Sequence, residues 1–293
     1  MQRVIWRPAF LEGEKTVSKR APTELMVRLF SALILIAAAV ALTLTSVETF
    51  AALITVFIAA MAWEWARLVR GAGFDFIFGA QLVSTVAASW TTAQGYPVSA
   101  LLMVGAGAVF VLLVQRLDDA RSLAWWSAAG VCYAGLPAIA LIWLRSDGAY
   151  GVLAVLYLFA VVWTTDSAGY LFGRMVGGPK LAPRISPSKT WAGFIGATAS
   201  AGLAGLVFGY ATQLDGAWLA AFGVALALIA QFGDLGESAV KRAFGMKDSS
   251  GLIPGHGGVL DRIDGLVFGA VAAAALAWII DPAHPGQAIL FRP

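Results

Sequence analysis

YGVLAVLYLFAVVWTTDSAGYLF, residues 150–172, decides the fold class. Its first sixteen residues carry no charged side chain, and a helix needs about 20 predominantly apolar residues to cross the hydrocarbon of a bilayer. Asp166 interrupts the run near its end. An ionisable group in such a segment is costly, so it indicates a functional site unless it only snorkels or is held by hydrogen bonds. The stretch therefore predicts a membrane-spanning helix with a functional acid near one end.

The rest of the chain has the same character. Of 293 residues, 59% are hydrophobic and 13% are charged, whereas a soluble domain carries about 25% charge. Apolar runs lie at 27–46, 48–66, 76–92, 98–115, 122–144, 150–172, 191–212, 216–233 and 265–280. We therefore predict an all-α, polytopic membrane protein with about nine transmembrane helices. We expect a polar N-terminal arm (1–26), then a single membrane-embedded domain (27–280), and then a short C-terminal tail (281–293).

The basic residues orient the predicted helices. Cytoplasmic loops of membrane proteins are rich in Lys and Arg. If the nine runs cross the membrane in turn, all of the 20 basic residues except Arg145 and Arg292 fall on the side of the amino terminus. We therefore expect a cytoplasmic amino terminus and a carboxyl terminus on the opposite side. The arm lacks the apolar middle of a signal peptide, so we expect no cleavage there. The net charge of +3 is too small to suggest a nucleic-acid partner.

Two long polar segments, 173–190 and 234–264, fall on the predicted cytoplasmic side. The first contains GGPKLAPRISPSKT, whose glycines and prolines predict a loop. Lys189 and Ser186, with neighbouring cations and hydroxyls, suit a phosphate, although the general excess of basic residues in cytoplasmic loops explains the cations as well. Gly169 and Gly173, just before the loop, are four apart, which fits either a site or plain helix packing.

The second polar segment combines acids, bases and glycines. Asp234 and Glu237 end an apolar helix, and Ser238, Lys241 and Arg242 continue with helical spacing. Asp261 and Asp264 are three residues apart at the start of the last helix, so they can share a hard cation. Mg²⁺ prefers few carboxylates together with waters and phosphates. Taken alone, Asp261 could also be a helix N-terminal acid favoured by the dipole, but the whole set predicts a metal and phosphate site.

His256 lies in a glycine-rich turn within this segment. It could be a metal ligand, a base or a loop residue held by the backbone. A lone histidine does not support a zinc site, so we favour a contact with phosphate. Gly255, Gly257 and Gly258 fit a backbone that approaches a ligand closely or takes positive φ.

The motif SAVKRAFGMKDSSGLIPGHGGVLDRID, residues 238–264, resembles the signature of phosphatidate cytidylyltransferases, also called CDP-diacylglycerol synthases. The signature has Ser238, Lys-Arg, Lys-Asp, Pro-x-His-Gly-Gly and Asp-Arg-x-Asp, and every fixed position is met. The segments 166–170 and 181–190 and the Trp-Glu-Trp at 63–65 are also similar to the family. The resemblance covers about residues 26–280.

This resemblance implies an activity and its partners. CTP and phosphatidate would give CDP-diacylglycerol and pyrophosphate in phospholipid biosynthesis, with Mg²⁺ and a second cation such as K⁺. It also implies a homodimer in the cell (inner) membrane, in contact with membrane lipid, with its active site facing the cytoplasm. A lateral groove lined by residues such as Trp191 and Phe232 is our expectation for the lipid's route to the site.

We assign roles to the motif residues as hypotheses. The predicted metal ligands are Asp166, Asp234, Asp248, Asp261 and Asp264. The predicted catalytic residues are Asp234, Lys241, Arg242, Asp261 and Asp264. The predicted CTP-binding residues are Ser186, Lys189, Ser238, Lys247, His256, Gly257, Gly258 and Arg262.

Other functions remain open at this point. Intramembrane acids also mark ion pathways in transporters, but the sequence has no internal repeat and its acids cluster near one face. Another lipid enzyme that uses CTP, such as a polyprenol kinase, would differ in its acceptor. A CDP-alcohol phosphotransferase would need an Asp-Gly-x-x-Ala-Arg signature, which is absent here.

Overall fold

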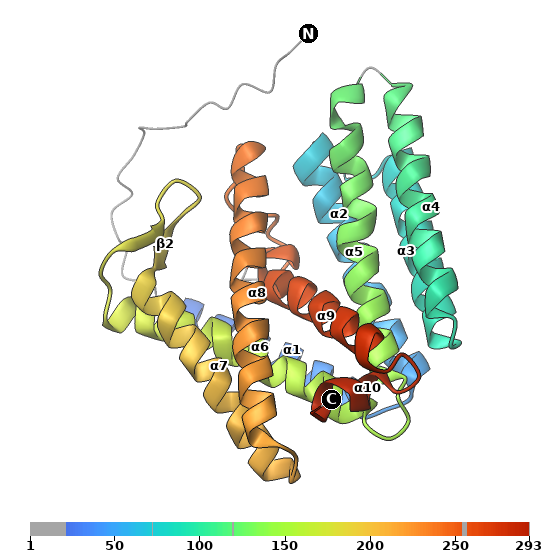
Figure 1. Ribbon diagram of the computed structural model, residues 1–293. Helices are drawn as coiled ribbons and strands as arrows, with labels where there is room; N and C mark the ends of the chain where they lie inside the picture. The colour runs from blue at the N-terminus through green and yellow to red at the C-terminus, as the bar shows by residue number, and fades with distance from the viewer. Residues whose placement is uncertain (1–21, 72, 119, 254–256, 293) are drawn as a thin grey trace.

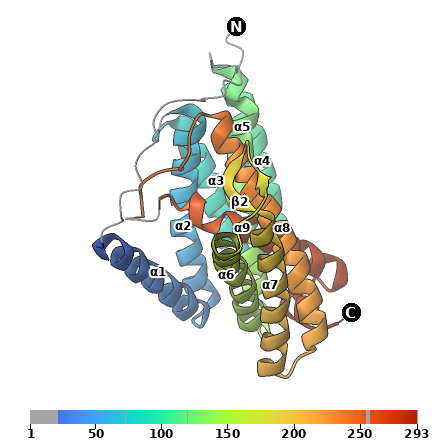
Figure 2. The ribbon, with the colours of Figure 1, turned by 90° about the vertical axis from the view of Figure 1, so that its left-hand side faces the viewer.

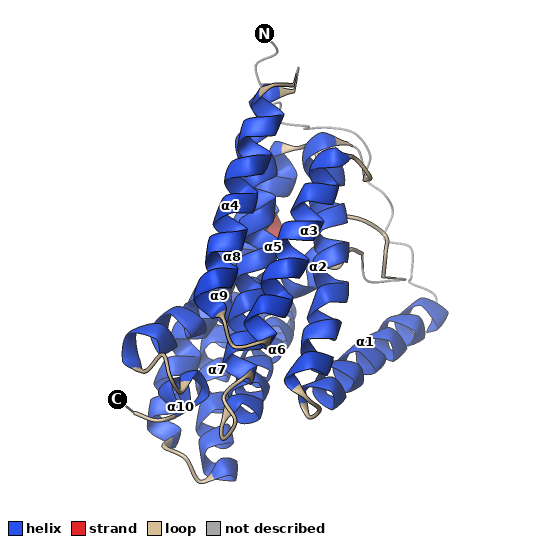
Figure 3. Ribbon diagram, turned by 90° about the vertical axis from the view of Figure 1, so that its right-hand side faces the viewer, coloured by secondary structure: helices blue, strands red, loops and turns tan. Residues whose placement is uncertain are grey.

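The computed structural model describes residues 22–71, 73–118, 120–253 and 257–292. Within these residues the chain is almost entirely helical (Figures 1 and 3). The long helices are α1 (Pro22–Thr43), α2 (Val47–Arg70), α3 (Phe76–Ala93), α4 (Pro97–Arg116), α5 (Ala124–Arg145), α6 (Gly151–Met175), α7 (Trp191–Thr212), α8 (Gly216–Ala243) and α9 (Leu260–Ile280). The short elements are a 3₁₀ turn (Arg121–Leu123), β1 (Lys180–Ala182), β2 (Ser186–Thr190) and α10 (Pro285–Leu290).

Each of the nine predicted apolar runs corresponds to one long helix, so the all-α fold class is confirmed. Three helix ends lie five or more residues from the ends of the apolar runs. Helix α1 begins at Pro22 rather than at 27, and α9 begins at Leu260 rather than at 265. Helix α8 continues to Ala243, ten residues beyond its apolar run, as the helical spacing of Ser238, Lys241 and Arg242 indicated. Hydropathy marks where apolar residues stop, but α8 and α9 continue through polar residues that bind one another across the site. The expected loop after α6 also contains structure, because β1 and β2 pair as an antiparallel hairpin.

Seven helices in the described part of the chain are long and apolar enough to span a membrane: α2, α4, α5 with its preceding 3₁₀ turn, α6, α7, α8 and α9. Helix α1 contributes only the shorter apolar segment Leu33–Thr43. Helix α3 carries six Gln, Ser and Thr side chains, which lower its hydropathy. The protein is therefore a multi-pass membrane protein, while nine spans and a cytoplasmic amino terminus stay predictions.

The helices form two groups that meet at α9. Figure 1 shows α2, α3, α4 and α5 side by side, with α6 running crosswise below them. The view in Figure 2 looks along α6 and shows α1 splayed away from α2. A small apolar core joins α3, α4 and α5, whereas the larger core joins α2 and α5 to α6, α8 and α9. Because α9 packs against both groups, it brings the end of α2 close to the end of α8.

Helix α4 exposes a continuous apolar surface. Leu102 is 70% exposed, and Val109 and Leu113 are exposed on the same helix. In a soluble protein such a surface would indicate an interface, but on a spanning helix it faces lipid at no cost. A substitution at Leu102 therefore changes a side chain that touches lipid rather than the protein interior.

Asp147 joins the connection between α5 and α6 to the short helix α10 near the carboxyl terminus. Its Oδ1 accepts from the backbone N–H groups of Ala149 and Tyr150, and its Oδ2 accepts from those of Gly286 and Gln287 at the start of α10. The residue is only 7% exposed. The carboxylate therefore satisfies two buried turns at once and fixes α10 against the α5–α6 connection.

Asp147→Ala is expected to lower stability by about 3 kcal/mol, because four backbone donors lose a charged acceptor. The measurement is the midpoint of thermal inactivation in detergent. Asp215→Ala is the matched control: Asp215 caps α8 at an exposed position through Ala217 N and Trp218 N, and its loss should cost about 1 kcal/mol. Equal shifts for the two variants would contradict the role given to Asp147.

Candidate active site

A polar cavity of about 590 Å³ lies between α6, the β-hairpin, α7, α8 and the start of α9. Nine residues predicted from the sequence line it: Asp166, Ser186, Lys189, Asp234, Lys241, Asp248, Asp261, Arg262 and Asp264. The two polar segments of the sequence therefore meet at one cavity. Five of the described lining residues are acidic and four are basic, so the cavity offers both carboxylate ligands for a cation and cations for phosphate.

Three carboxylates form a cluster beside the cavity, which we call the carboxylate cluster. Asp234 and Glu237 lie three residues apart on α8, and Asp264 lies on α9; one oxygen of each is within 4.8 Å of the others. Glu237 is 3% exposed, and its Oε1 has no hydrogen-bond partner among the described residues. Carboxylate oxygens that converge in this way suit Mg²⁺. The buried Oε1 without a partner also fits a bound cation.

Glu237 was absent from our sequence-based list of metal ligands. We treated it only as the end of an apolar helix, because the hydropathy of that helix falls at residue 233. The signal that would have found it is its spacing of three from Asp234, which places both acids on one side of the helix that Ser238, Lys241 and Arg242 continue.

Asp261 has its oxygens engaged by protein groups. Its Oδ1 accepts from Lys241, and its Oδ2 lies 2.9 Å from Ser249 N and 3.0 Å from both Ser249 Oγ and Gly258 N. Lys241 in turn lies 2.9 Å from Oε2 of Glu237. In this arrangement Asp261 holds Lys241 and the loop before α9, next to the carboxylate cluster. Its predicted role as a metal ligand stays a prediction.

A second buried acid organises the same loop from the far side. Glu64 of α2 is 0% exposed. It accepts hydrogen bonds from the hydroxyls of Ser249 and Ser250 and from the backbone N–H groups of Val259 and Leu260. We call this set the Glu64 latch. It connects α2 to the first turn of α9, and Ser249 Oγ links Glu64 to Asp261.

The sequence showed Glu64 only as part of a Trp-Glu-Trp similar to the family, without a role. Its neighbours fix it in place. Trp65 donates from its indole to the carbonyl of Trp126, 2.8 Å away, and stacks on Tyr133. Trp63 lies under the guanidinium of Arg67. The contacts of Trp65 therefore hold α2 against α5, in the register that places Glu64 against the start of α9.

The glycines of the loop are required by close approach. Gly257 has φ +89°, a left-handed conformation that glycine adopts readily. A Cβ on Gly258 would lie 1.8 Å from Ser249 Oγ and 2.6 Å from Glu64 Oε1. Gly258 therefore lies close to Ser249 and Glu64, which both belong to the Glu64 latch. The predicted phosphate contact of His256, and the prediction for Gly255, lie outside the described residues.

The β-hairpin forms one wall of the cavity. Lys189 pairs with Asp234 of α8, and Ser186 Oγ lies 3.5 Å from Ser188 Oγ. Thr190 caps α7 by accepting from Gly193 N at 3.1 Å. A phosphate that reached Lys189 would therefore compete with a carboxylate of the carboxylate cluster for the same ammonium group.

The remaining predicted residues surround this wall. Arg242 is exposed and donates to the carbonyls of Ile185 and Met246, so it ties the hairpin to the end of α8. Ser238, Lys247, Gly257 and Gly258 are not among the residues that line the cavity. Asp166 is exposed to the cavity from α6.

The two glycines after Asp166 serve helix packing as well as the cavity. A Cβ on Gly193 of α7 would lie 2.7 Å from the carbonyl of Gly169 and 3.3 Å from Gly173 Cα. The backbones of α6 and α7 therefore touch at the cavity wall, as the packing interpretation requires.

An exposed aromatic cluster adjoins the cavity on the α7–α8 surface. Phe194 lines the cavity, and its ring lies 5.8 Å from that of Trp191 and 6.1 Å from that of Phe232. Trp191 and Phe232 are both exposed. The lipid route expected there stays a prediction.

Comparisons with known proteins agree with this site. A profile described as the cytidylyltransferase family matches residues 26–280. A protein of Brucella suis biovar 1 (strain 1330), named phosphatidate cytidylyltransferase, is 45% identical over 226 residues, covering 75% of this chain and 79% of that protein. A protein of the same name from Staphylococcus aureus (strain COL) is 43% identical over 165 residues, covering 54% of this chain and 62% of that protein. The resemblance inferred from the motif at 238–264 is confirmed, and the chain belongs to the cytidylyltransferase family.

Proposed function

We propose that this protein is a phosphatidate cytidylyltransferase, which makes CDP-diacylglycerol and pyrophosphate from CTP and phosphatidate. The observation that carries this proposal is the carboxylate cluster at the edge of a cavity that also presents Lys189, Lys241 and Arg262. The relatives named phosphatidate cytidylyltransferase support the same reaction.

The substrates explain why both signs of charge are needed. CTP and phosphatidate are polyanions that repel each other, so a site that joins them must neutralise charge on both. The four basic side chains of the cavity are the groups available for the phosphates. We assign the triphosphate to Lys189 and Lys241, and the lipid phosphate to Arg262, because Arg262 also borders an apolar pocket.

The reaction is an in-line displacement at the α-phosphorus of CTP. A phosphate oxygen of phosphatidate forms the new O–P bond, and the bond between the α-phosphorus and the bridging oxygen to the β-phosphorus breaks. Pyrophosphate leaves with that electron pair. The attacking oxygen is already an anion, so a general base is not required. The basic side chains that bind the two substrates hold the reacting groups in line, and they stabilise the negative charge of the leaving pyrophosphate.

Asp234, Glu237 and Asp264 would hold Mg²⁺, which supplies positive charge to the phosphates when bound. A second cation such as K⁺ beside it, a homodimer, a position in the cell (inner) membrane and a cavity that faces the cytoplasm complete the proposal. The cavity lies among the two polar segments, 173–190 and 234–264, which carry eight of the 20 basic residues, and this supports the cytoplasmic side.

The test uses purified protein in detergent with phosphatidate, Mg²⁺ and CTP labelled in the α-phosphate. We expect label in the organic phase, and we expect its loss when a chelator removes Mg²⁺ and its recovery when Mg²⁺ is restored. Transfer that continues in chelator would reject the assigned metal. No organic-phase label from folded protein would reject the reaction, and γ-labelled CTP with a polyprenol acceptor would then test the kinase alternative.

A further inference from the structure

We propose that the apolar pocket between α1, α2, α5, α6 and α9 takes one fatty acyl chain of the phosphate-bearing lipid substrate. The proposal rests on the proposed function, because it names where the lipid of that reaction lies. The pocket has a volume of about 150 Å³ and is separate from the polar cavity. It fits a single chain segment rather than a headgroup.

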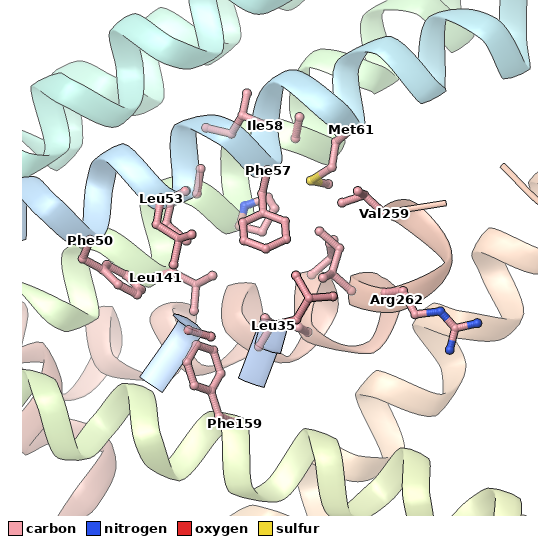
Figure 4. A pocket seen from close by; sticks show the side chains of 18 of the residues that line it. Leu35, Phe50, Leu53, Phe57, Ile58, Met61, Leu141, Phe159, Val259 and Arg262 are labelled. Carbon is pink, nitrogen blue, oxygen red and sulfur yellow. The ribbon is translucent and has the colours of Figure 1, made fainter. Parts of the chain in front are cut away.

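The lining of this pocket is chemically uniform. Apart from Arg262 and the Trp163 indole, its described side chains are hydrocarbon or thioether groups. Figure 4 shows Leu53 and Phe57 of α2 facing Phe159 of α6, with Val259 at the start of α9 closing one end. Such a lining offers no partner for a polar ligand, so its occupant must be a hydrocarbon.

Arg262 indicates what kind of ligand carries this hydrocarbon. It is the residue that lines both this pocket and the polar cavity. In Figure 4 its guanidinium points away from the apolar side chains. Arg262 therefore borders the apolar pocket and also lines the polar cavity. A ligand that spans the two compartments needs a phosphate at one end and a chain at the other, which is the chemistry of phosphatidate.

Helix α1 makes the pocket reachable from the bilayer. It packs mainly on α2 and α6, and Figure 2 shows it diverging from α2 at one end. A chain already dissolved in lipid gains little hydrophobic free energy by entering another apolar space. The pocket therefore acts by position: a chain held there fixes the phosphate at Arg262 and beside the carboxylate cluster.

Leu53→Trp tests the proposal by filling the pocket. Leu53 lines it and is only partly buried, so a larger ring has room to be accommodated. For long-chain phosphatidate we expect kcat/KM to fall about tenfold or more, since a displaced substrate reacts poorly. For a water-soluble phosphatidate with two-carbon (acetyl) chains, and for the KM of CTP, we expect less than about a twofold change, because such chains are too short to occupy the pocket.

Leu102→Trp is the matched control, because Leu102 is 70% exposed on the lipid-facing surface of α4. Leu102→Trp should leave kcat/KM unchanged for both the long-chain and the short-chain phosphatidate. Equal losses on long and short chains in Leu53→Trp, or no loss on long chains, would overturn the pocket assignment. Wild-type protein without any cytidylyl transfer would instead count against the proposed function.

A second measurement does not depend on activity. Phosphatidate that carries a diazirine at the end of one chain is photolysed with the wild-type protein, and adducts are mapped by mass spectrometry. We expect adducts on α2 and α6 near Phe57 and Phe159, reduced by unlabelled phosphatidate but not by phosphatidylcholine. Equal competition by both lipids, or adducts confined to the α7–α8 surface near Trp191 and Phe232, would overturn the proposal.

Discussion

Asp264→Asn is expected to lower kcat by at least about a thousandfold while the protein remains folded in the membrane. Asn has nearly the shape of Asp, but the change removes one negative charge from the carboxylate cluster. Asp234 and Glu237 remain, so the site keeps two of its three converging acids. The loss should therefore appear as a weaker cation site and a slower reaction together.

Two measurements check this expectation. Organic-phase transfer of label from CTP gives kcat at increasing Mg²⁺, and electron paramagnetic resonance of Mn²⁺ reports cation binding without turnover. Asp281→Asn is the control, because Asp281 is an exposed acid bonded to His284 after α9, outside the cavity. Wild-type Mn²⁺ affinity in Asp264→Asn would remove Asp264 from the metal site, even if turnover were slow.

Glu64→Gln is expected to reduce kcat by about a hundredfold, although Glu64 does not line the cavity. Each oxygen of Glu64 accepts one backbone N–H of the first turn of α9, from Val259 or Leu260. A Gln amide would turn its NH₂ toward one of these donors and leave that backbone group without an acceptor. The start of α9 would shift, and Asp261 and Asp264 would shift with it.

The readout must separate a positioning role from simple loss of stability. Hydrogen exchange should increase in the loop 244–253 and at the start of α9, and the Mg²⁺ concentration for half-maximal rate should rise. Glu48→Gln, an exposed acid on the same helix, should change neither quantity. If Glu64→Gln lowered only the melting temperature, with unchanged Mg²⁺ dependence and exchange in that loop, the latch would be a structural contact alone.

The sequence predicted where the helices lie, and which kinds of residue gather at the cavity, better than it predicted the contacts between those residues. Apolar runs located all nine long helices, and seven of these helices have the length and polarity that a bilayer imposes on a span. The apolar runs failed at the end of α8, where the helix continues through polar residues: Lys241 pairs with Glu237 one turn earlier on α8 and with Asp261 of α9. Motif spacing selected Asp234 and Asp264, which lie together in the carboxylate cluster, but it assigned no role to Glu64.

Glu64 received no role from the sequence because its hydrogen-bond partners lie far away along the chain. Glu64 meets its donors only through tertiary packing of α2 on α9, and a single acid between two tryptophans has no local pattern that names a partner. Asp261 shows the converse. Its spacing from Asp264 suggested a shared cation, yet its hydrogen bonds to Ser249 and Gly258 depend on a loop whose path no periodicity describes.

Glu64 is synthesised long before the groups that it binds. A ribosome adds about 5–20 residues per second, so the 185 residues between Glu64 and Ser249 take roughly 10–40 s. Throughout that interval the nascent second helix carries an acid without its donors, and placing such a group in hydrocarbon costs on the order of 3 kcal/mol. A chain arrested before its ninth helix should therefore keep Glu64 at the membrane surface. The candidate active site is therefore completed only after the start of α9 has been made, late in the synthesis of the chain.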